Sequence, residues 1–236
     1  MSRDNTQNNI EAFSKSIGIS FNDISVLHTA FTHRSYVNEH RGENIEHNER
    51  LEFLGDAVLE LSVTRYLFDK YGEKTEGDLT AYRAALVNTN TISAAATKLG
   101  MNDCLFLSKG ESRDVGRARQ YILADTFEAV IGAIYLDQGY EVADDFISKN
   151  IFPLADEVVK NILWQDSKSF FQEKAQEHVS ITPSYAVVKE EGPDHDKHFT
   201  VGAFLGTEQV ATGKGRSKQE AEQEAAQAAL TAKDWA

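Results

Sequence analysis

The feature that most constrains this chain is the run HNERLEFLGDAVLEL at residues 47–61, which has the period of a helix. At about 100° per residue, its hydrophobic residues gather on one side. This apolar stripe consists of Leu51, Leu54, Val58 and Leu61. Glu49, Glu52 and Asp56 fall together on another side. We therefore predict a helix over about residues 46–68 that buries the stripe and presents three carboxylates along one face.

Two interpretations of this acidic face are open. Stacked like charges repel each other mildly, and such a face is usually a solvated helix surface. However, Arg50 is the only basic residue between Glu49 and Glu60, and Phe53 lies beside the acids rather than in the stripe. A large ring next to clustered carboxylates indicates a surface that meets something other than water. Glu60 continues the face, and we treat it as solvated.

Composition restricts the class of protein. The single cysteine, Cys104, excludes an internal disulfide and fits a reducing compartment such as the cytoplasm. The sequence has no run of about 18 apolar residues, so we expect no membrane span. A net charge of −13 argues against a simple nucleic-acid binder. That objection is removed if the carboxylates hold divalent cations, or if basic residues cluster locally.

The pattern before the first proline, Pro153, is helical throughout and predicts an all-α first domain at residues 9–150. The residues from Thr32 to Tyr36 break the pattern and predict a loop. Besides the acidic helix, helices are expected at residues 10–17, 23–31, 75–87, 88–99, 122–133 and 141–150. Residues 151–165 read as a helical tail and linker, and a second domain follows at 166–235.

Further acids lie in two of these helices. Thr75 is expected to cap the helix at 75–87, with Glu76 in its first turn, where the helix dipole favours an anion. Asp125 and Glu128 are spaced i, i+3 and therefore share one face of the helix at 122–133. Three arginines precede that helix, and they are either salt-bridge partners of the acids or contacts to a polyanion. They are Arg113, Arg117 and Arg119.

The second domain has a different pattern. A helix is expected at residues 168–178, followed by strands at 184–190, 197–205 and 208–213. An alanine-rich helix at 217–232, capped by Ser217, completes the chain. The predicted order is therefore helix, three antiparallel strands, helix.

Several stretches resemble a known family. The run NERLEFLGDAVL at residues 48–59 and the run LADTFEA at 123–129 resemble the two acidic motifs of bacterial ribonuclease III. The second domain, with GKGRSK at 213–218, resembles a double-stranded-RNA-binding domain. The resemblance covers nearly the whole chain. It implies an all-α N-terminal ribonuclease III domain plus an α+β (α-β-β-β-α) double-stranded-RNA-binding domain.

The resemblance also implies roles for the acids. It makes Glu52, Asp125 and Glu128 direct ligands of Mg²⁺, with Mn²⁺ as a substitute. Asp56 would position or activate the attacking water, a task that Glu128 shares. Glu49 and Glu76 would be accessory acids. A rival carboxylate-bridged di-iron bundle requires Glu-x-x-His on its helices, and this spacing does not occur in the sequence.

The resemblance further implies contacts to RNA and a homodimer with Phe53 at its interface. The implied RNA-binding residues are Gln172, Glu173, His195, Lys214, Arg216, Ser217 and Lys218. The family pattern has paired lysines after the serine, whereas this chain has Lys218-Gln219. Residues 166–236 also carry 8 basic against 12 acidic side chains. We therefore expect modest RNA affinity that falls steeply with salt.

The function that follows is magnesium-dependent hydrolysis of double-stranded RNA in the cytoplasm. The substrates implied are structured precursors of ribosomal and messenger RNA, cut to leave 5′-phosphates and short 3′ overhangs. The alternative is a double-stranded-RNA-binding protein that does not cleave. A substitution at Asp56 or Glu128 would have favoured that alternative, and both acids are present.

Overall fold

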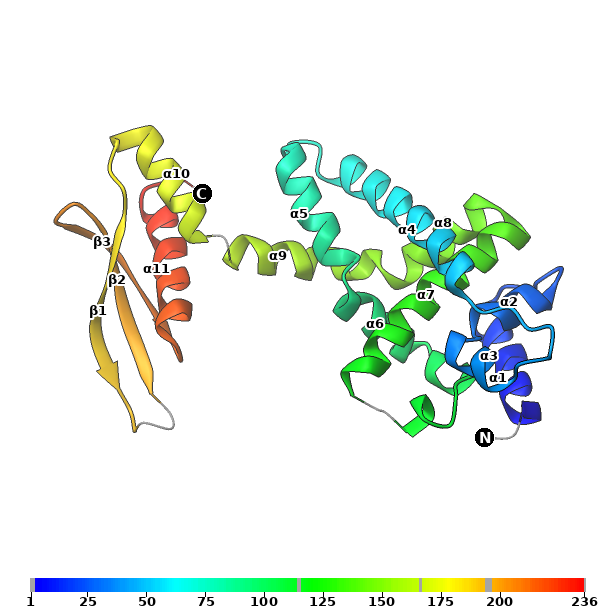
Figure 1. The fold of residues 1–236 in the computed structure, drawn as a ribbon. Helices are drawn as coiled ribbons and strands as arrows, with labels where there is room; N and C mark the ends of the chain where they lie inside the picture. Colours follow the sequence, from blue (N-terminus) through cyan, green and yellow to red (C-terminus); the bar gives the residue numbers. More distant parts are fainter. Residues whose placement is uncertain (1–2, 114–115, 166, 194–196, 236) are drawn as a thin grey trace. The chain divides into compact units, whose positions relative to one another are not determined.

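The computed structural model describes residues 3–113, 116–165, 167–193 and 197–235, and it divides into two compact units at Val158/Val159. The first unit is helical, and the second combines helices with a sheet (Figure 1). This confirms the predicted fold class. In the described residues no helix is both long enough and apolar enough to cross a membrane.

The first unit is built from helices joined by short loops. They are α1 (Arg3–Ser16), α2 (Ile24–Ala30), α3 (Arg34–Glu39), α4 (Glu49–Lys70), α5 (Glu76–Leu86), α6 (Thr89–Lys98), α7 (Arg117–Gln138) and α8 (Tyr140–Asn150). Short 3-10 turns lie at Met101–Cys104, Glu111–Arg113 and Phe152–Leu154. The helix α9 (Ala155–Gln165) begins in this unit and crosses the unit boundary.

Side-chain caps explain where several helices begin. The hydroxyl of Thr75 accepts the Asp78 N–H and the Asp78 carboxylate accepts the Thr75 N–H, a capping box that confirms the predicted start of α5. The loop predicted at residues 32–36 is wrong, because α3 begins at Arg34. There the ring nitrogen Nδ1 of His33 accepts the Ser35 N–H at 3.3 Å, so a polar stretch without apolar periodicity still starts a helical turn.

The centre of the first unit is the close crossing of α4 and α7 (Figure 1). A Cβ atom on Gly55 of α4 would lie 1.7 Å from the carbonyl oxygen of Glu128 on α7. A Cβ atom on Gly132 would lie 2.2 Å from the carbonyl oxygen of Leu51. The two backbones therefore touch, and only glycine fits at either position. Because Glu52 and Asp56 flank Gly55 on α4, the crossing brings them next to Glu128.

This crossing also sets which face of α4 is buried. The buried residues are Leu51, Gly55, Val58, Leu59, Ser62, Val63 and Leu67. The predicted stripe is correct at Leu51 and Val58 but wrong at Leu61, whose side chain is 57% exposed. The face that meets α7 is centred on the small residue Gly55, which a search for large apolar side chains does not weigh.

The segment predicted as a linker begins with residues that pack on the first unit. Ile151 and Ala155 are buried, and the ring of Phe152 stacks on that of Tyr66 at a centroid distance of 3.9 Å. The Lys70 ammonium donates to Asp156 Oδ1 at 2.6 Å, and the Tyr71 hydroxyl donates to the same oxygen. The start of α9 is therefore held against the C-terminal end of α4.

The second unit follows the predicted order. It consists of α10 (Ser167–Val179), β1 (Ser184–Glu191), β2 (His198–Leu205), β3 (Glu208–Gly215) and α11 (Lys218–Ala232). In the part of this unit that the structure describes, the strands form an antiparallel sheet in the order β1-β2-β3. Both helices pack on one face of the sheet (Figure 1). Their shared core is small, and contains Phe171, Ala175, Ala203, Leu205, Ala225, Ala226, Ala229 and Leu230.

The α4–α7 crossing yields a stability prediction. Gly55→Ala places a methyl group inside the backbone of α7, so the helices must separate, and we expect a loss of more than about 3 kcal/mol in the unfolding free energy. Gly77→Ala is the matched control, because the nearest atom to its Cβ is 3.8 Å away. It should be neutral or slightly stabilising. Urea unfolding followed by circular dichroism measures both, and equal stability of the two variants would contradict the prediction.

Candidate metal and catalytic site

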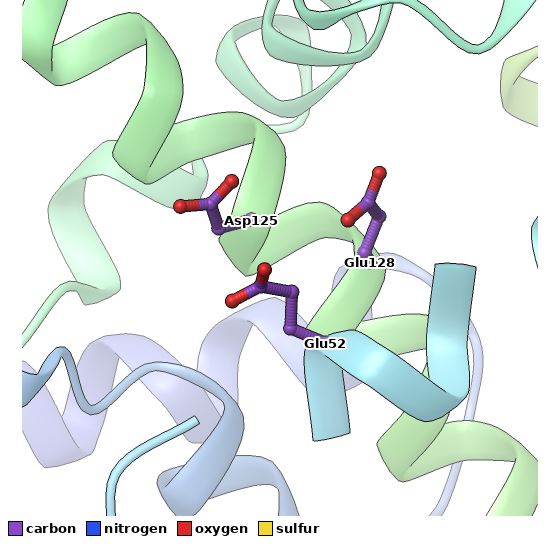
Figure 2. Close-up of side chains that lie close together, drawn as sticks. All are labelled: Glu52, Asp125 and Glu128. Atoms are coloured by element: carbon purple, nitrogen blue, oxygen red, sulfur yellow. The ribbon is translucent and has the colours of Figure 1, made fainter. Parts of the chain in front are cut away.

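Three carboxylates converge beside the α4–α7 crossing (Figure 2). Glu52 extends from α4, and Asp125 and Glu128 extend from α7. One oxygen from each side chain lies within 4.8 Å of the others. The structure therefore brings together the three acids that the sequence implied as direct metal ligands, although Glu52 lies 73 residues before Asp125 in the chain.

Local sequence explains how α7 presents its two acids. The i, i+3 spacing places Asp125 and Glu128 on one face, and both side chains are half-buried. The residues between and after them, Thr126, Phe127 and Ala129, are fully buried and fix the rotation of the helix. Glu52 lies one turn before Gly55, so the glycine contact determines its distance from α7.

The site holds its carboxylates at a high electrostatic cost. Burial, followed by repulsion from Asp56, Asp125 and Glu52, raises the pKa of Glu128 to about 8. Burial, followed by repulsion from Asp125, raises the pKa of Glu52 to about 7. Without a cation, protons reside on this cluster near neutral pH. Carboxylates forced together in this way have a strong affinity for positive charge.

The neighbouring acids extend the cluster. Asp56 is exposed as a whole residue, but its carboxylate is partly screened from water. This partial burial, followed by repulsion from Glu60, raises the pKa of Asp56. Burial also raises the pKa of Asp125. Glu49 lies close enough to add to the negative potential at both Glu52 and Asp125.

One residue of this region was missed in the sequence. The Arg34 guanidinium at the start of α3 pairs with Glu49 at 3.4 Å, and its charge partly offsets the rise that burial causes in the pKa values of Glu52 and Asp125. Arg34 lies in the stretch that was predicted as a loop, 15 residues before its partner, so neither periodicity nor spacing could have identified it.

Of the three arginines named in the sequence analysis, Arg117 and Arg119 lie in the first turn of α7 and contact groups other than the acids of the site. The buried Arg119 donates to Asn102 Oδ1 at 2.8 Å and to the carbonyl oxygen of Glu111 at 2.7 Å. Arg117 donates to the Tyr121 hydroxyl at 3.3 Å, and its guanidinium lies over that ring. Arg113 is exposed at the end of the 3-10 turn. For Arg119 both sequence interpretations are therefore wrong, because its contacts are those of a structural residue.

Two further predicted residues lie outside the group of three acids. Glu76 is in the first turn of α5, where its carboxylate accepts the Thr80 hydroxyl at 3.0 Å. Phe53 is 82% exposed and lines a groove beside Leu54 and Leu136. The ring follows Glu52 in the sequence and lines this groove together with Glu49 and with residues of α2 and α7. Of the described residues that line the groove, none belongs to the group of three acids.

The predicted RNA contacts lie on two exposed parts of the second unit. Gln172 and Glu173 line an open groove on α10. Lys214, Arg216 and Lys218 are exposed at the β3–α11 junction. Ser217 is the N-cap of α11, and its hydroxyl accepts the Glu220 N–H at 3.1 Å. His195 lies outside the described residues.

The donor set fits a hard divalent cation. Three carboxylates supply only oxygen, which Mg²⁺ and Mn²⁺ prefer, and three protein ligands leave coordination positions for water and phosphate. A cation at the site would replace the protons that the raised pKa values of Glu52 and Glu128 retain.

The raised pKa of Glu128 predicts a pH-dependent stability in the absence of metal. The folded state retains a proton that the unfolded state releases above about pH 4.5, so stability should fall as pH rises from 5 to 8. The side chain of Glu128→Gln is uncharged at every pH in this range. The variant should therefore be more stable than the wild type by about 1–3 kcal/mol at pH 8 after allowance for solvent screening. Thermal unfolding in EDTA measures the difference. Glu60→Gln should keep most of the wild-type pH dependence; a profile like that of Glu128→Gln would refute the assignment.

Comparisons with known proteins agree with this arrangement. A family model described as Ribonuclease-III-like matches residues 23–155, and a double-stranded RNA binding motif matches residues 167–232. A curated relative named Ribonuclease 3, from Geobacillus thermodenitrificans, is 49% identical over 216 residues, which is 92% of this chain and 87% of the relative. Another, from Pelotomaculum thermopropionicum, is 44% identical over 97% of this chain and 95% of its own length.

A solved structure shows the same similarity for the first unit. It is the nuclease domain of ribonuclease III from Campylobacter jejuni, with 42% identity and a TM-score of 0.55. The match covers 61% of this chain and 99% of that domain. With two matched domains in the same order and relatives that span nearly its full length, the chain belongs to the ribonuclease III family of endoribonucleases.

Proposed function

We propose that this endoribonuclease cleaves double-stranded RNA by magnesium-dependent hydrolysis at the cluster of Glu52, Asp125 and Glu128. The single observation that carries the proposal is the convergence of these three carboxylates to within 4.8 Å of one another. It occurs in a chain that also contains a double-stranded RNA binding motif. The combination joins a site suited to a divalent cation with a module suited to the substrate.

The residues have separate tasks in this proposal. Mg²⁺, when bound, would lower the pKa of a water molecule and neutralise charge that develops at the leaving oxygen. Glu52, Asp125 and Glu128 would hold the ion. The exposed Asp56, one turn after Glu52, would accept a hydrogen bond from the attacking water and orient it. Glu128 lies at the α4–α7 crossing, close enough to Asp56 to feel its charge, and we propose that it shares with Asp56 the activation of the water besides binding the metal.

The remaining acids modify the site. Glu49 adds negative potential at Glu52, and its ion pair with Arg34 places a cation where RNA phosphate would approach. Glu76, in the first turn of α5, is proposed as an accessory acid outside the group of three ligands.

The second unit would hold the duplex. Such modules read A-form shape and backbone rather than sequence. Gln172 and Glu173 on α10 and His195 are proposed to contact minor grooves. Lys214, Arg216, Ser217 and Lys218 would contact phosphates at the start of α11, where the helix dipole attracts anions. The substrates we propose are structured precursors of ribosomal and messenger RNA in the cytoplasm.

A duplex has two antiparallel strands, so cutting both requires two sites related by a two-fold axis. A symmetric homodimer provides this arrangement. Offset cuts by the two sites would leave 5′-phosphates and short 3′ overhangs.

We propose that the two copies meet at the exposed groove that residues of α2, α4 and α7 line. Phe53 is 82% exposed and Leu136 is 59% exposed, and the groove of about 740 Å³ that they line also contains Val26 and Leu54. Apolar surface of this kind is costly in water. A second copy would cover it and would place two acidic clusters on one assembly.

Cleavage of an end-labelled RNA duplex tests the activity. The wild type in Mg²⁺ should produce short staggered duplexes. Glu128→Gln should lose at least about a thousandfold in rate, because the variant removes a metal ligand and a proton acceptor together. Ca²⁺ should support binding without cleavage, since its larger shell does not reproduce the Mg²⁺ geometry. Glu60→Gln is the matched control and should cleave normally. Binding without cleavage by the wild type in every divalent metal would favour the non-cleaving alternative.

The dimer has its own test. Phe53→Ala removes the most exposed ring of the groove and should weaken self-association at least about tenfold. Phe170→Ala on α10 makes the same change in the second unit, and should leave association unchanged. Sedimentation equilibrium measures both variants. A Phe53→Ala protein that associates as tightly as the Phe170→Ala protein would contradict the placement of the interface.

A further inference from the structure

One acidic residue of the second unit lies beside the lysines that are proposed to contact RNA. Glu190 on β1 pairs across the sheet with Phe199 on β2, which pairs in turn with Gly215 on β3. Gly215 adjoins the start of α11, since its Cβ would lie 2.6 Å from the Ala221 nitrogen. Glu190 therefore belongs to the same end of the sheet as the β3–α11 junction.

The two oxygens of Glu190 contact two lysines. Oε2 lies 3.1 Å from the Lys197 ammonium, and Oε1 lies 3.8 Å from the Lys218 ammonium. The Lys218 ammonium also lies over the ring of Phe199, at 5.6 Å from its centroid. One carboxylate and one ring thus hold the side chain of Lys218 over the sheet.

Carboxylates occupy backbone donors at the same junction. The Arg216 N–H donates to Glu220 Oε2 at 2.8 Å, and the Lys214 N–H donates to Glu224 Oε2. In the absence of RNA, groups that suit a phosphate are therefore engaged by oxygen anions of the chain itself. Among these three acids, Glu190 is the one that contacts lysine side chains in the described part of the chain.

We propose that Glu190 is a positioning residue that sets the strength of duplex binding, because it holds Lys197 and Lys218 and competes with RNA phosphate for them. The inference rests on the proposed contact between Lys218 and RNA. When the duplex binds, Lys218 must turn from Glu190 toward phosphate, and the carboxylate then remains close to the backbone and repels it. This accounts for a module that contains the expected lysine yet should bind weakly.

The size of the effect follows from the exposure of the groups. The side chains of Glu190 and Lys218 are 39% and 59% exposed, so their interaction is screened by water and weak. Removing the charge of Glu190 should therefore tighten binding by about two- to fivefold. Because salt screens such contacts, the gain should shrink as ionic strength rises toward 1 M.

The test compares Glu190→Gln with Glu191→Gln in the full chain, using a duplex RNA in EDTA so that cleavage does not occur. Glu191 is the matched control, because it is the next residue of β1 and its carboxylate pairs with Lys189 at 2.6 Å. Both variants change the net charge equally. We expect Glu190→Gln to bind about two- to fivefold more tightly and Glu191→Gln to change by less than about 1.5-fold. Equal effects, no tightening, or weaker binding by Glu190→Gln would overturn the proposal.

Measuring Glu190→Gln in a Lys218→Gln variant distinguishes failure of the proposed RNA contact from failure of the proposed role of Glu190. Lys218→Gln should weaken duplex binding, and in that background Glu190→Gln should have at most half of its effect on log Kd. If Lys218→Gln binds like the wild type, the proposed RNA contact of Lys218 is wrong and the inference falls with it. If Lys218→Gln weakens binding but the effect of Glu190→Gln is unchanged, the RNA contact stands and the role of Glu190 is wrong.

Discussion

The rest of the first unit depends on the close contact between the backbones of α4 and α7. At Gly55 and Gly132 neither helix carries a side chain, so the two helices approach until backbone meets backbone. Each acid of the site lies within about one turn of that contact, on one helix or the other. Any change in the separation of the helices would move Glu52 relative to Glu128. The packing of α4 on α7 therefore also determines the geometry of the proposed metal site.

The close packing of α4 on α7 opposes the electrostatic repulsion among the carboxylates. Burial and mutual repulsion raise the pKa values of Glu52 and Glu128, which means that the folded state holds these carboxylates at a cost in free energy. The core beneath them, which includes Phe127, Val130 and Leu59, is fully buried and offsets the cost. A bound cation would convert repulsion into attraction, and the α4–α7 contact ensures that the carboxylates do not relax apart before it binds.

How much of this the sequence could predict differs from residue to residue. The acids Glu52, Asp125 and Glu128 could be named as candidate metal ligands from the sequence, because helical spacing and motif resemblance are both properties of short stretches. Their convergence needed the helix crossing, which depends on small residues that apolar periodicity ignores; Leu61 was misplaced for the same reason. Arg34 and Arg119 were beyond prediction, because their partners lie in other elements and polar contacts leave no periodic trace.

In the second unit the positions of the acidic side chains explain more than their number does. Its acidic side chains are not spread evenly, since Glu190, Glu220 and Glu224 contact the segment that carries Lys214, Arg216 and Lys218. These three acids therefore add to the negative charge of the module, and they also hold its lysine and backbone N–H donors in place. In such an array a bound RNA phosphate would replace a carboxylate of the chain instead of pairing with a free cation. Each contact would therefore add less to the affinity, and the duplex would dissociate more readily. If Lys214, Arg216 and Lys218 contact RNA as we propose, a module of this kind would release a cut duplex more readily than one whose cations have no internal partner.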